Sequence, residues 1–198
     1  MKKFCLFVFG IIFLLTSQAA AQNKVVVIPF FTNDTTPPVA CTGTLSAGGR
    51  WCDQGDGTVK DLTTKLIWLK EAGWGGSKPW RNSSTDCSSP DYTCFDDAHL
   101  KVGVLWQGTS DAGLSDGSQT GDWRLPRLKE LLAITEGIEP ISPASMQFFT
   151  NVQESYWSSG SYPSHLILLG MYVNMTTGTG SWNEKYNLLS IWAVKDSN

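Results

Sequence analysis

The sequence predicts a β or α+β domain, rich in loops; of these we expect α+β, with two helices around small antiparallel sheets and two disulfides that close short loops. Its 198 residues are one ordinary domain's length of chain. Nineteen glycines and nine tryptophans, with 41% hydrophobic and 17% charged residues, are typical of a folded chain held together by aromatic side chains. Short apolar runs between turn signals predict strands, and two longer segments have helical spacing.

A secretory signal peptide is expected over residues 1–21. Lys2 and Lys3 precede an apolar run at 4–15, which is shorter than the roughly 20 residues that span a bilayer. Ala19-Ala20-Ala21 then supplies small residues before a cleavage point. The later apolar stretches are shorter still, so we expect an exported protein without a membrane span, in the periplasm, at the cell surface or in the medium.

The charge pattern argues against a nucleic-acid partner. The formal charge is −3, and removal of two lysines with the signal makes the chain more acidic. Proteins that bind nucleic acid present basic runs or patches to the phosphates, and the sequence has no basic run.

Four cysteines remain after the signal, and an even number in an exported chain predicts disulfides. Three pairings are possible. We expect Cys41–Cys52 and Cys87–Cys94, because each pair encloses a short loop rich in turn-forming residues. Zinc is disfavoured, since no Cys-x-x-Cys spacing occurs and the chain has two histidines.

The chain divides into an N-terminal arm with a Cys-bounded loop, residues 22–50, and a domain over residues 51–198. The arm contains a β-prone run and ends in a Thr- and Pro-rich tether. Within the domain, apolar runs and the Asp56-Gly57 turn signal predict strands over 58–60, 66–69, 156–159, 165–175 and 188–194. Apolar spacing predicts helices over 95–106 and from Pro126 to Gly137.

Several short motifs occur in a specific order. Gly-Asp-Trp-Arg-Leu-Pro at 121–126 is followed by Tyr-Trp-Ser-Ser at 156–159 and Ile-Trp-Ala-Val-Lys at 191–195. Over most of the mature chain, the sequence resembles the bacterial domain family named after the C-terminal domain of the Legionella collagen-like protein. The resemblance implies a C-type-lectin-like fold, related to the formylglycine-generating-enzyme type. It also implies an exported, non-catalytic binding or adhesion domain, since the named member is a surface adhesin that binds sulfated glycans.

Two features differ from that member: the sequence has no collagen stalk, and residues 81–94 look like an insertion. The motif residues are expected to be structural. Trp123 and Trp157 are assigned to packing, Pro126 to the first turn of a helix, and Arg124 to a network with Glu130.

Aromatic side chains are the first candidate sugar site. Trp74 and Trp80 lie in a Gly-rich loop, and Trp182 follows a Thr- and Gly-rich turn. A tryptophan face offers rigid apolar contact to the C–H groups of a sugar. Lys78 and Arg81 stand near the first two and would contribute to a modest basic patch.

Calcium-dependent sugar binding is the alternative. Glu139, Asn183 and Glu184 occur in short stretches that partly match the calcium motifs of lectins with this fold, and hard oxygen ligands suit that ion. Chance similarity is the better explanation, so no cofactor is expected, with calcium as the open alternative.

No catalytic constellation emerges from the residues. There is no Gly-x-Ser-x-Gly elbow, and His99 and His165 lie in a predicted helix and a predicted strand. We therefore expect a secreted or surface-exposed, non-catalytic domain that recognises a glycan or a protein partner. The first alternative is an assembly module of a cell envelope or appendage, whose arm adds a strand to a partner sheet. The second is an enzyme, of the formylglycine-generating or another type.

Overall fold

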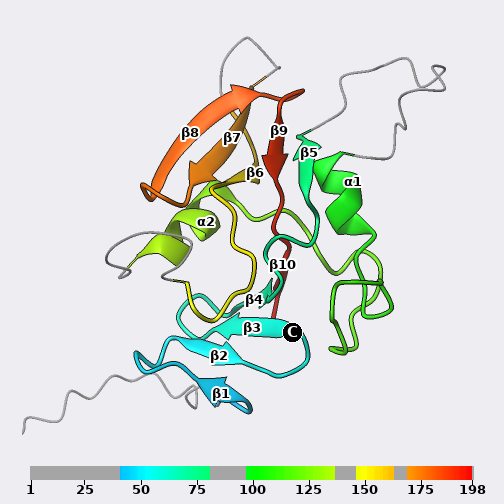
Figure 1. Cartoon of the computed structure of the whole chain (residues 1–198), viewed down its shortest axis with the longest axis vertical. Coiled ribbons are helices and arrows are strands. Elements are labelled where there is room, and N and C mark those ends of the chain that lie inside the picture. The colour runs from blue at the N-terminus through cyan, green and yellow to red at the C-terminus, as the bar shows by residue number, and fades with distance from the viewer. Residues whose placement is uncertain (1–40, 81–96, 137–145, 163–168, 198) are drawn as a thin grey trace, which may run out of the picture. The chain divides into compact units, whose positions relative to one another are not determined.

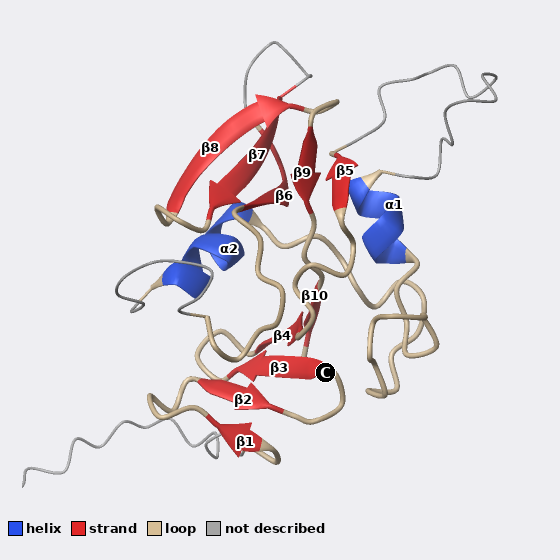
Figure 2. Cartoon of the chain, in the orientation of Figure 1, coloured by secondary structure: helices blue, strands red, loops and turns tan. Residues whose placement is uncertain are grey.

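Two five-stranded sheets carry the described part of the chain (Figures 1 and 2). The computed structural model describes residues 41–80, 97–136, 146–162 and 169–197. All of them belong to one of the two units into which the chain divides, residues 37–198. The predicted signal peptide and the β-prone run of the arm lie outside the described residues.

The first sheet is antiparallel and is built mainly from the N-terminal part of the domain. Its strands, in spatial order, are β1 (Thr44–Leu45), β2 (Trp51–Asp53), β3 (Thr58–Asp61), β4 (Leu66–Leu69) and β10 (Val194–Asp196). Val194 of β10 stands opposite Trp68 of β4, so residues far apart in sequence complete the sheet. A disulfide joins Cys41 to Cys52 beside β1 and β2, which confirms the first expected pairing.

The second sheet holds the strands that follow, again in spatial order: β5 (Ser77–Pro79), β9 (Leu188–Ser190), β6 (Ser155–Ser161), β7 (Leu169–Asn174) and β8 (Thr179–Glu184). The pairing of β6 with β9 is parallel, and the other pairings are antiparallel. β7 and β8 form a hairpin in uninterrupted register, from Leu169 opposite Glu184 to Asn174 opposite Thr179. β8 is therefore an edge strand.

Two short helices accompany the sheets. α1 (Ala98–Gly103) begins where the carboxylate of Asp97 accepts a hydrogen bond from the Leu100 N–H at 2.9 Å. α2 (Leu128–Thr135) contacts β6, β7 and β8, and Figure 2 shows it beside one face of that sheet. The Glu130 carboxylate reaches back to the Arg127 N–H at 2.7 Å and so satisfies one free donor of the first turn of α2.

Tryptophans fill the core between the elements. Trp68, Trp123, Trp157 and Trp192 are all fully buried. The Trp192 ring lies 5.3 Å from that of Trp68 and 5.0 Å from that of Tyr156, between centroids. Trp68 belongs to β4 and Tyr156 to β6, so Trp192 connects the cores of the two sheets.

The expected α+β, C-type-lectin-like class is wrong. The described chain is mostly β, with two sheets and two short helices. Of the helix expected over 95–106, the described residues form α1, after which the Leu105 N–H closes a tighter turn to the Val102 carbonyl; residues 95 and 96 lie outside the described residues. Of the two expected disulfides the structure has Cys41–Cys52, while Cys87 and Cys94 lie outside the described residues.

Some expected strands also differ from the observed ones. The run predicted over 188–194 divides into β9 in one sheet and β10 in the other, with buried residues 191–193 between them. A continuous apolar run has no period that would reveal such a break. The strands β1, β2, β5 and β8 are additional to those expected.

Candidate binding site

The three tryptophans expected to form a sugar platform lie in different surroundings. Trp80 is only 8% exposed. Its indole N–H donates to the Ser158 carbonyl at 2.7 Å, and its ring packs edge-on against His99. Trp74 packs against the core, with the Lys101 ammonium 4.7 Å from its ring centroid. These contacts tie Trp74 and Trp80 to the fold.

Of the two basic residues expected near Trp74 and Trp80, the structure describes one. Lys78 is half-buried on β5, and its carbonyl accepts a hydrogen bond from the Trp157 indole at 2.9 Å. Arg81 lies outside the described residues. Of these two residues the structure therefore describes Lys78, whose backbone contributes to β5 and to the packing of Trp157.

Trp182 is the platform residue that faces solvent. It lies on edge strand β8 and is 51% exposed. Its ring stands 5.9 Å from that of Tyr162, which is 38% exposed, and the two planes are inclined by 47°. Together they form an exposed pair of rings, which we call the aromatic pair.

The strand register brings the aromatic pair together across β7. The Tyr162 N–H donates to the Leu169 carbonyl at 3.0 Å, so Tyr162 continues the pairing of β6 with β7. Trp182 pairs with β7 from the other side, opposite Met171. The rings thus come from two strands that are separated by a third. This contact depends on register, and the local sequence around Tyr162 gave no sign of it.

Asn183 and Glu184 end strand β8, and their side chains form hydrogen bonds within the strand end and with the turn that follows. The Asn183 amide oxygen accepts from the Glu184 N–H at 2.9 Å and from the Asn187 side chain at 2.7 Å. One carboxylate oxygen of Glu184 accepts a hydrogen bond from the Tyr186 hydroxyl. Glu139, the third calcium candidate, is outside the described residues. Among the described residues, no group of three or more His, Cys, Asp or Glu side chains could hold a metal ion.

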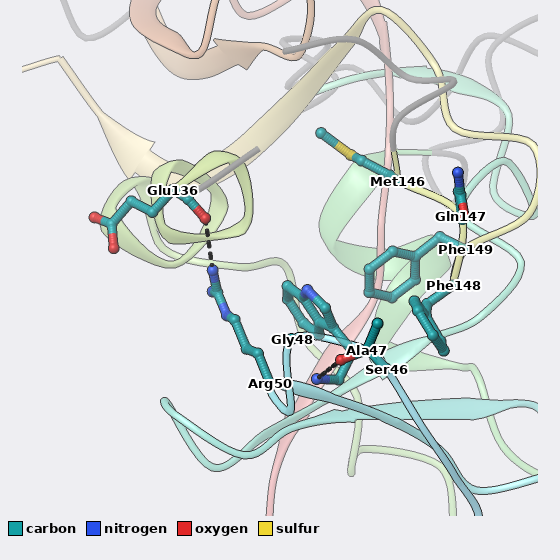
Figure 3. A pocket seen from close by; sticks show the side chains of 10 residues that line it. Ser46, Ala47, Gly48, Arg50, Glu136, Met146, Gln147, Phe148 and Phe149 are labelled. Atoms are coloured by element: carbon teal, nitrogen blue, oxygen red, sulfur yellow. Dashed lines mark hydrogen bonds between the residues drawn. The ribbon is translucent and has the colours of Figure 1, made fainter. Parts of the chain in front are cut away.

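A pocket lies where the turn before β2 meets the end of α2 (Figure 3). It has a volume of about 410 Å³ and a mainly apolar lining that includes Trp51, Met146 and Phe149. The Trp51 and Phe149 rings meet edge to face at 5.2 Å. This pocket draws on three segments of the chain, and no motif in the sequence indicated it.

Arg50 is the cation of this pocket, and it serves the fold. It forms an ion pair with Asp61 at 2.8 Å and donates to the α2 carbonyls of Ala133 at 2.6 Å and Glu136 at 3.1 Å. Figure 3 shows Arg50 reaching across to Glu136. Burial alone would raise the pKa of Asp61, but hydrogen bonds from Arg50 and from the Thr63 N–H outweigh it and hold that pKa below its ordinary value.

The motif residues occupy structural positions. Trp123 and Trp157 are buried in the core, and Pro126 is a buried residue just before α2. Arg124 donates to Glu130 at 2.8 Å, as expected, and also to Asp196 of β10 at 2.9 Å. The hydrogen bond to Glu130 raises the pKa of the Arg124 guanidinium. Arg124 therefore joins α2 to the first sheet.

The fold and this site define a mostly β domain with a tryptophan core and an exposed aromatic pair at the edge of one sheet. The chain belongs to the family of the Lcl C-terminal domain, whose model matches residues 57–195. This match confirms the resemblance that the motifs indicate. It places the chain among bacterial extracellular or surface domains.

The match extends over the four fully buried tryptophans and both rings of the aromatic pair. No curated protein matches the chain. None of the helices in the described ranges is long and apolar enough to cross a membrane. The chain is therefore assigned to a family and not to an individual protein within it.

Proposed function

We propose that the chain is a secreted or surface-exposed, non-catalytic domain that binds a glycan through the aromatic pair of Trp182 and Tyr162. The observation that carries this proposal is the exposure of two large rings that lie 5.9 Å apart, Trp182 on edge strand β8 and Tyr162 just after β6. Full burial of one large apolar side chain stabilises a fold by about 1.5–3 kcal/mol. Because both rings are partly exposed, the fold gains only part of this free energy from them. A ligand that covers the rings recovers some of that free energy.

Sugars suit such a surface. A pyranose has a face of C–H groups that packs on an aromatic ring, while its hydroxyls remain at the periphery for hydrogen bonds. The rings of tryptophan and tyrosine have few rotatable bonds, so ordering them on binding has a small entropic cost. The hydrogen-bonding groups of Asn183 and Glu184 follow Trp182 directly in the chain.

The state of the described carboxylates supports a non-catalytic role. Those whose pKa is lowered are Asp53, Asp61, Asp116 and Glu130, and each is paired with a lysine or arginine. A general acid or base works best with a pKa near the working pH. These four groups are shifted away from it, and their charges stabilise the fold.

The test is binding of the purified chain to a glycan array, with calcium and with chelator. We expect binding that persists in chelator and that weakens about tenfold in Trp182→Ala, which corresponds to about 1.4 kcal/mol. The matched control is Trp106→Ala, because Trp106 is 42% exposed but lies outside the aromatic pair. Chelator-sensitive binding would instead favour calcium held by Glu139, Asn183 and Glu184. Absence of glycan binding, or equal loss in both variants, would refute the proposal.

A further inference from the structure

We infer that the aromatic pair receives an uncharged pyranose, with Glu184 accepting hydrogen bonds from its hydroxyls, and that it discriminates against sulfated and other anionic glycans. This inference rests on the proposed function and specifies the class of ligand. It is based on which side chains share the face of the sheet that carries Trp182.

Strand alternation determines that face. Successive side chains of a strand point to opposite sides of the sheet, so Trp182 and Glu184 share one face of β8, and Asn183 belongs to the other. Residues opposite each other in the register lie on the same face. Met171 stands opposite Trp182, and Leu169 stands opposite Glu184. On the described strands β7 and β8, this face therefore combines apolar side chains with one carboxylate, that of Glu184.

Glu184 is suited to bind hydroxyls. It is exposed, and the Tyr186 hydroxyl holds one of its carboxylate oxygens. A carboxylate has about four lone-pair sites, so acceptor capacity remains for a ligand. Hydrogen bonds to an ionised acceptor are roughly twice as strong as neutral ones. The spacing of two residues along β8 places this acceptor beside the ring, at the edge of a stacked sugar.

The nearby lysine belongs to the opposite face. Gly170 stands opposite Asn183, and a Cβ added at Gly170 would lie 3.0 Å from the Trp80 ring. Trp80 thus packs on the face that Asn183 shares, away from Trp182. The Lys185 ammonium lies 4.0 Å from the centroid of the Trp80 ring, which places this cation with Trp80 on that face. The charged side chain that β7 and β8 place on the face of the aromatic pair is therefore the carboxylate of Glu184, and the whole chain is acidic as well.

A sulfate on the stacked sugar would be repelled by Glu184. At a separation of about 5–7 Å, and with an effective dielectric constant between that of water and that of a protein surface, two like charges weaken binding by about threefold to tenfold. Salt screens this repulsion, so the discrimination should shrink as the ionic strength rises. The direction of the effect of sulfate on affinity distinguishes this site from a basic glycan-binding patch, where a sulfate group strengthens binding.

The experiment uses matched probes: immobilised lactose and N-acetyllactosamine, each beside its sulfated form, at about 20 mM and about 500 mM salt. The variants are Glu184→Gln and Trp182→Ala, with Glu154→Gln as the control. Glu154 is also exposed and immediately precedes β6, whereas Tyr162 follows the other end of that strand. The control therefore removes the same charge from the same sheet at a distance from the aromatic pair. Circular dichroism and thermal unfolding establish that each variant is folded.

We expect the uncharged probes to bind about threefold to tenfold more tightly than their sulfated forms at low salt, and Trp182→Ala to weaken their binding about tenfold. Glu184→Gln should bring the ratio close to one, while Glu154→Gln leaves it unchanged. Equal or tighter binding of the sulfated probes through Trp182 would overturn this inference and leave the proposed function intact. A ratio that Glu184→Gln does not alter would also overturn it. A chain that binds no glycan on the wider array would refute the proposed function itself.

Discussion

Removal of the Arg50 side chain should destabilise the domain by about 3–4 kcal/mol. Arg50→Ala leaves the Asp61 carboxylate, whose side chain is 1% exposed, without its cation. Loss of one partner of a buried ion pair typically costs about 3–5 kcal/mol. Arg50 is partly exposed, which places the pair at the lower end of that range. The same change exposes the last carbonyls of α2, whose interaction with a cation is worth about 0.3–1 kcal/mol.

The measurement is urea unfolding followed by tryptophan fluorescence, with Lys129→Ala as the control. Lys129 is an exposed cation of α2, and its removal should change the free energy of unfolding by less than about 0.5 kcal/mol. The urea midpoint should fall in Arg50→Ala with little change in the slope, because the surface exposed on unfolding is nearly the same.

A double variant tests the cause of the effect. Adding Asp61→Asn to Arg50→Ala removes the unpaired negative charge. The new amide oxygen can still accept a hydrogen bond from the Thr63 N–H, which in the parent chain donates to Asp61 at 2.9 Å. We therefore expect the double variant to be more stable than Arg50→Ala alone. If it is equally stable or less stable, the reasoning from a buried unpaired carboxylate is refuted.

Three further outcomes are expected. Gly57→Ala should lower the free energy of unfolding in urea by about 2–4 kcal/mol, because Gly57 has φ +88° and a Cβ there would lie 2.2 Å from the Gly113 carbonyl oxygen. The control Gly48→Ala should be nearly neutral, since a Cβ at Gly48 meets nothing within 4 Å. Acid should destabilise the domain through Asp61: its folded pKa lies below the ordinary 3.8, so its contribution is present above that pH and is lost as the pH falls through the folded pKa. A series of melts at decreasing pH should show a smaller loss in Asp61→Asn. Trp182→Ala should leave the melting temperature within about 2 °C of the parent chain, and a larger fall would mean that this ring supports the fold.

Part of this structure could be predicted from residues near one another in the chain. The Cys41–Cys52 disulfide closes a short loop, and α2 begins close to the proline that signals it. The burial of Trp123 and Trp157 agrees with their assignment to packing from the strand-like motifs that contain them. In each case the signal lies within a few residues of the feature.

The fold class depends on information of another kind. β1 has two residues and β5 has three, too few to show an alternation of polar and apolar side chains. The apolar run before residue 195 divides between two sheets, and only the pairing partners decide where. Short strands and distant partners therefore led the sequence argument to a larger helical share than the structure has.

The candidate site shows the same limit. The turn before Trp182 drew attention to that residue, whose ring is exposed, but its ring partner Tyr162 comes from the far side of β7. Trp80 lies in a segment whose glycines favour a loop, yet Gly170 on a distant strand leaves room for its ring against the sheet. Exposure of a tryptophan is decided by such neighbours, which a single sequence does not display.

The pairing of β10 with β4 determines when the first sheet can be completed. Val194 and Trp68 are neighbours in space but are separated by most of the domain's sequence, and Trp192 must enter the core in the same step. Contacts between distant residues form slowly, since the intervening chain has to close a large loop first. Trp192 and Val194 lie near the end of the domain, so a ribosome has synthesised almost all of the domain before it adds them. Folding of this core is therefore expected to follow synthesis of the domain, so that the chain stays unfolded until nearly all of it has been made.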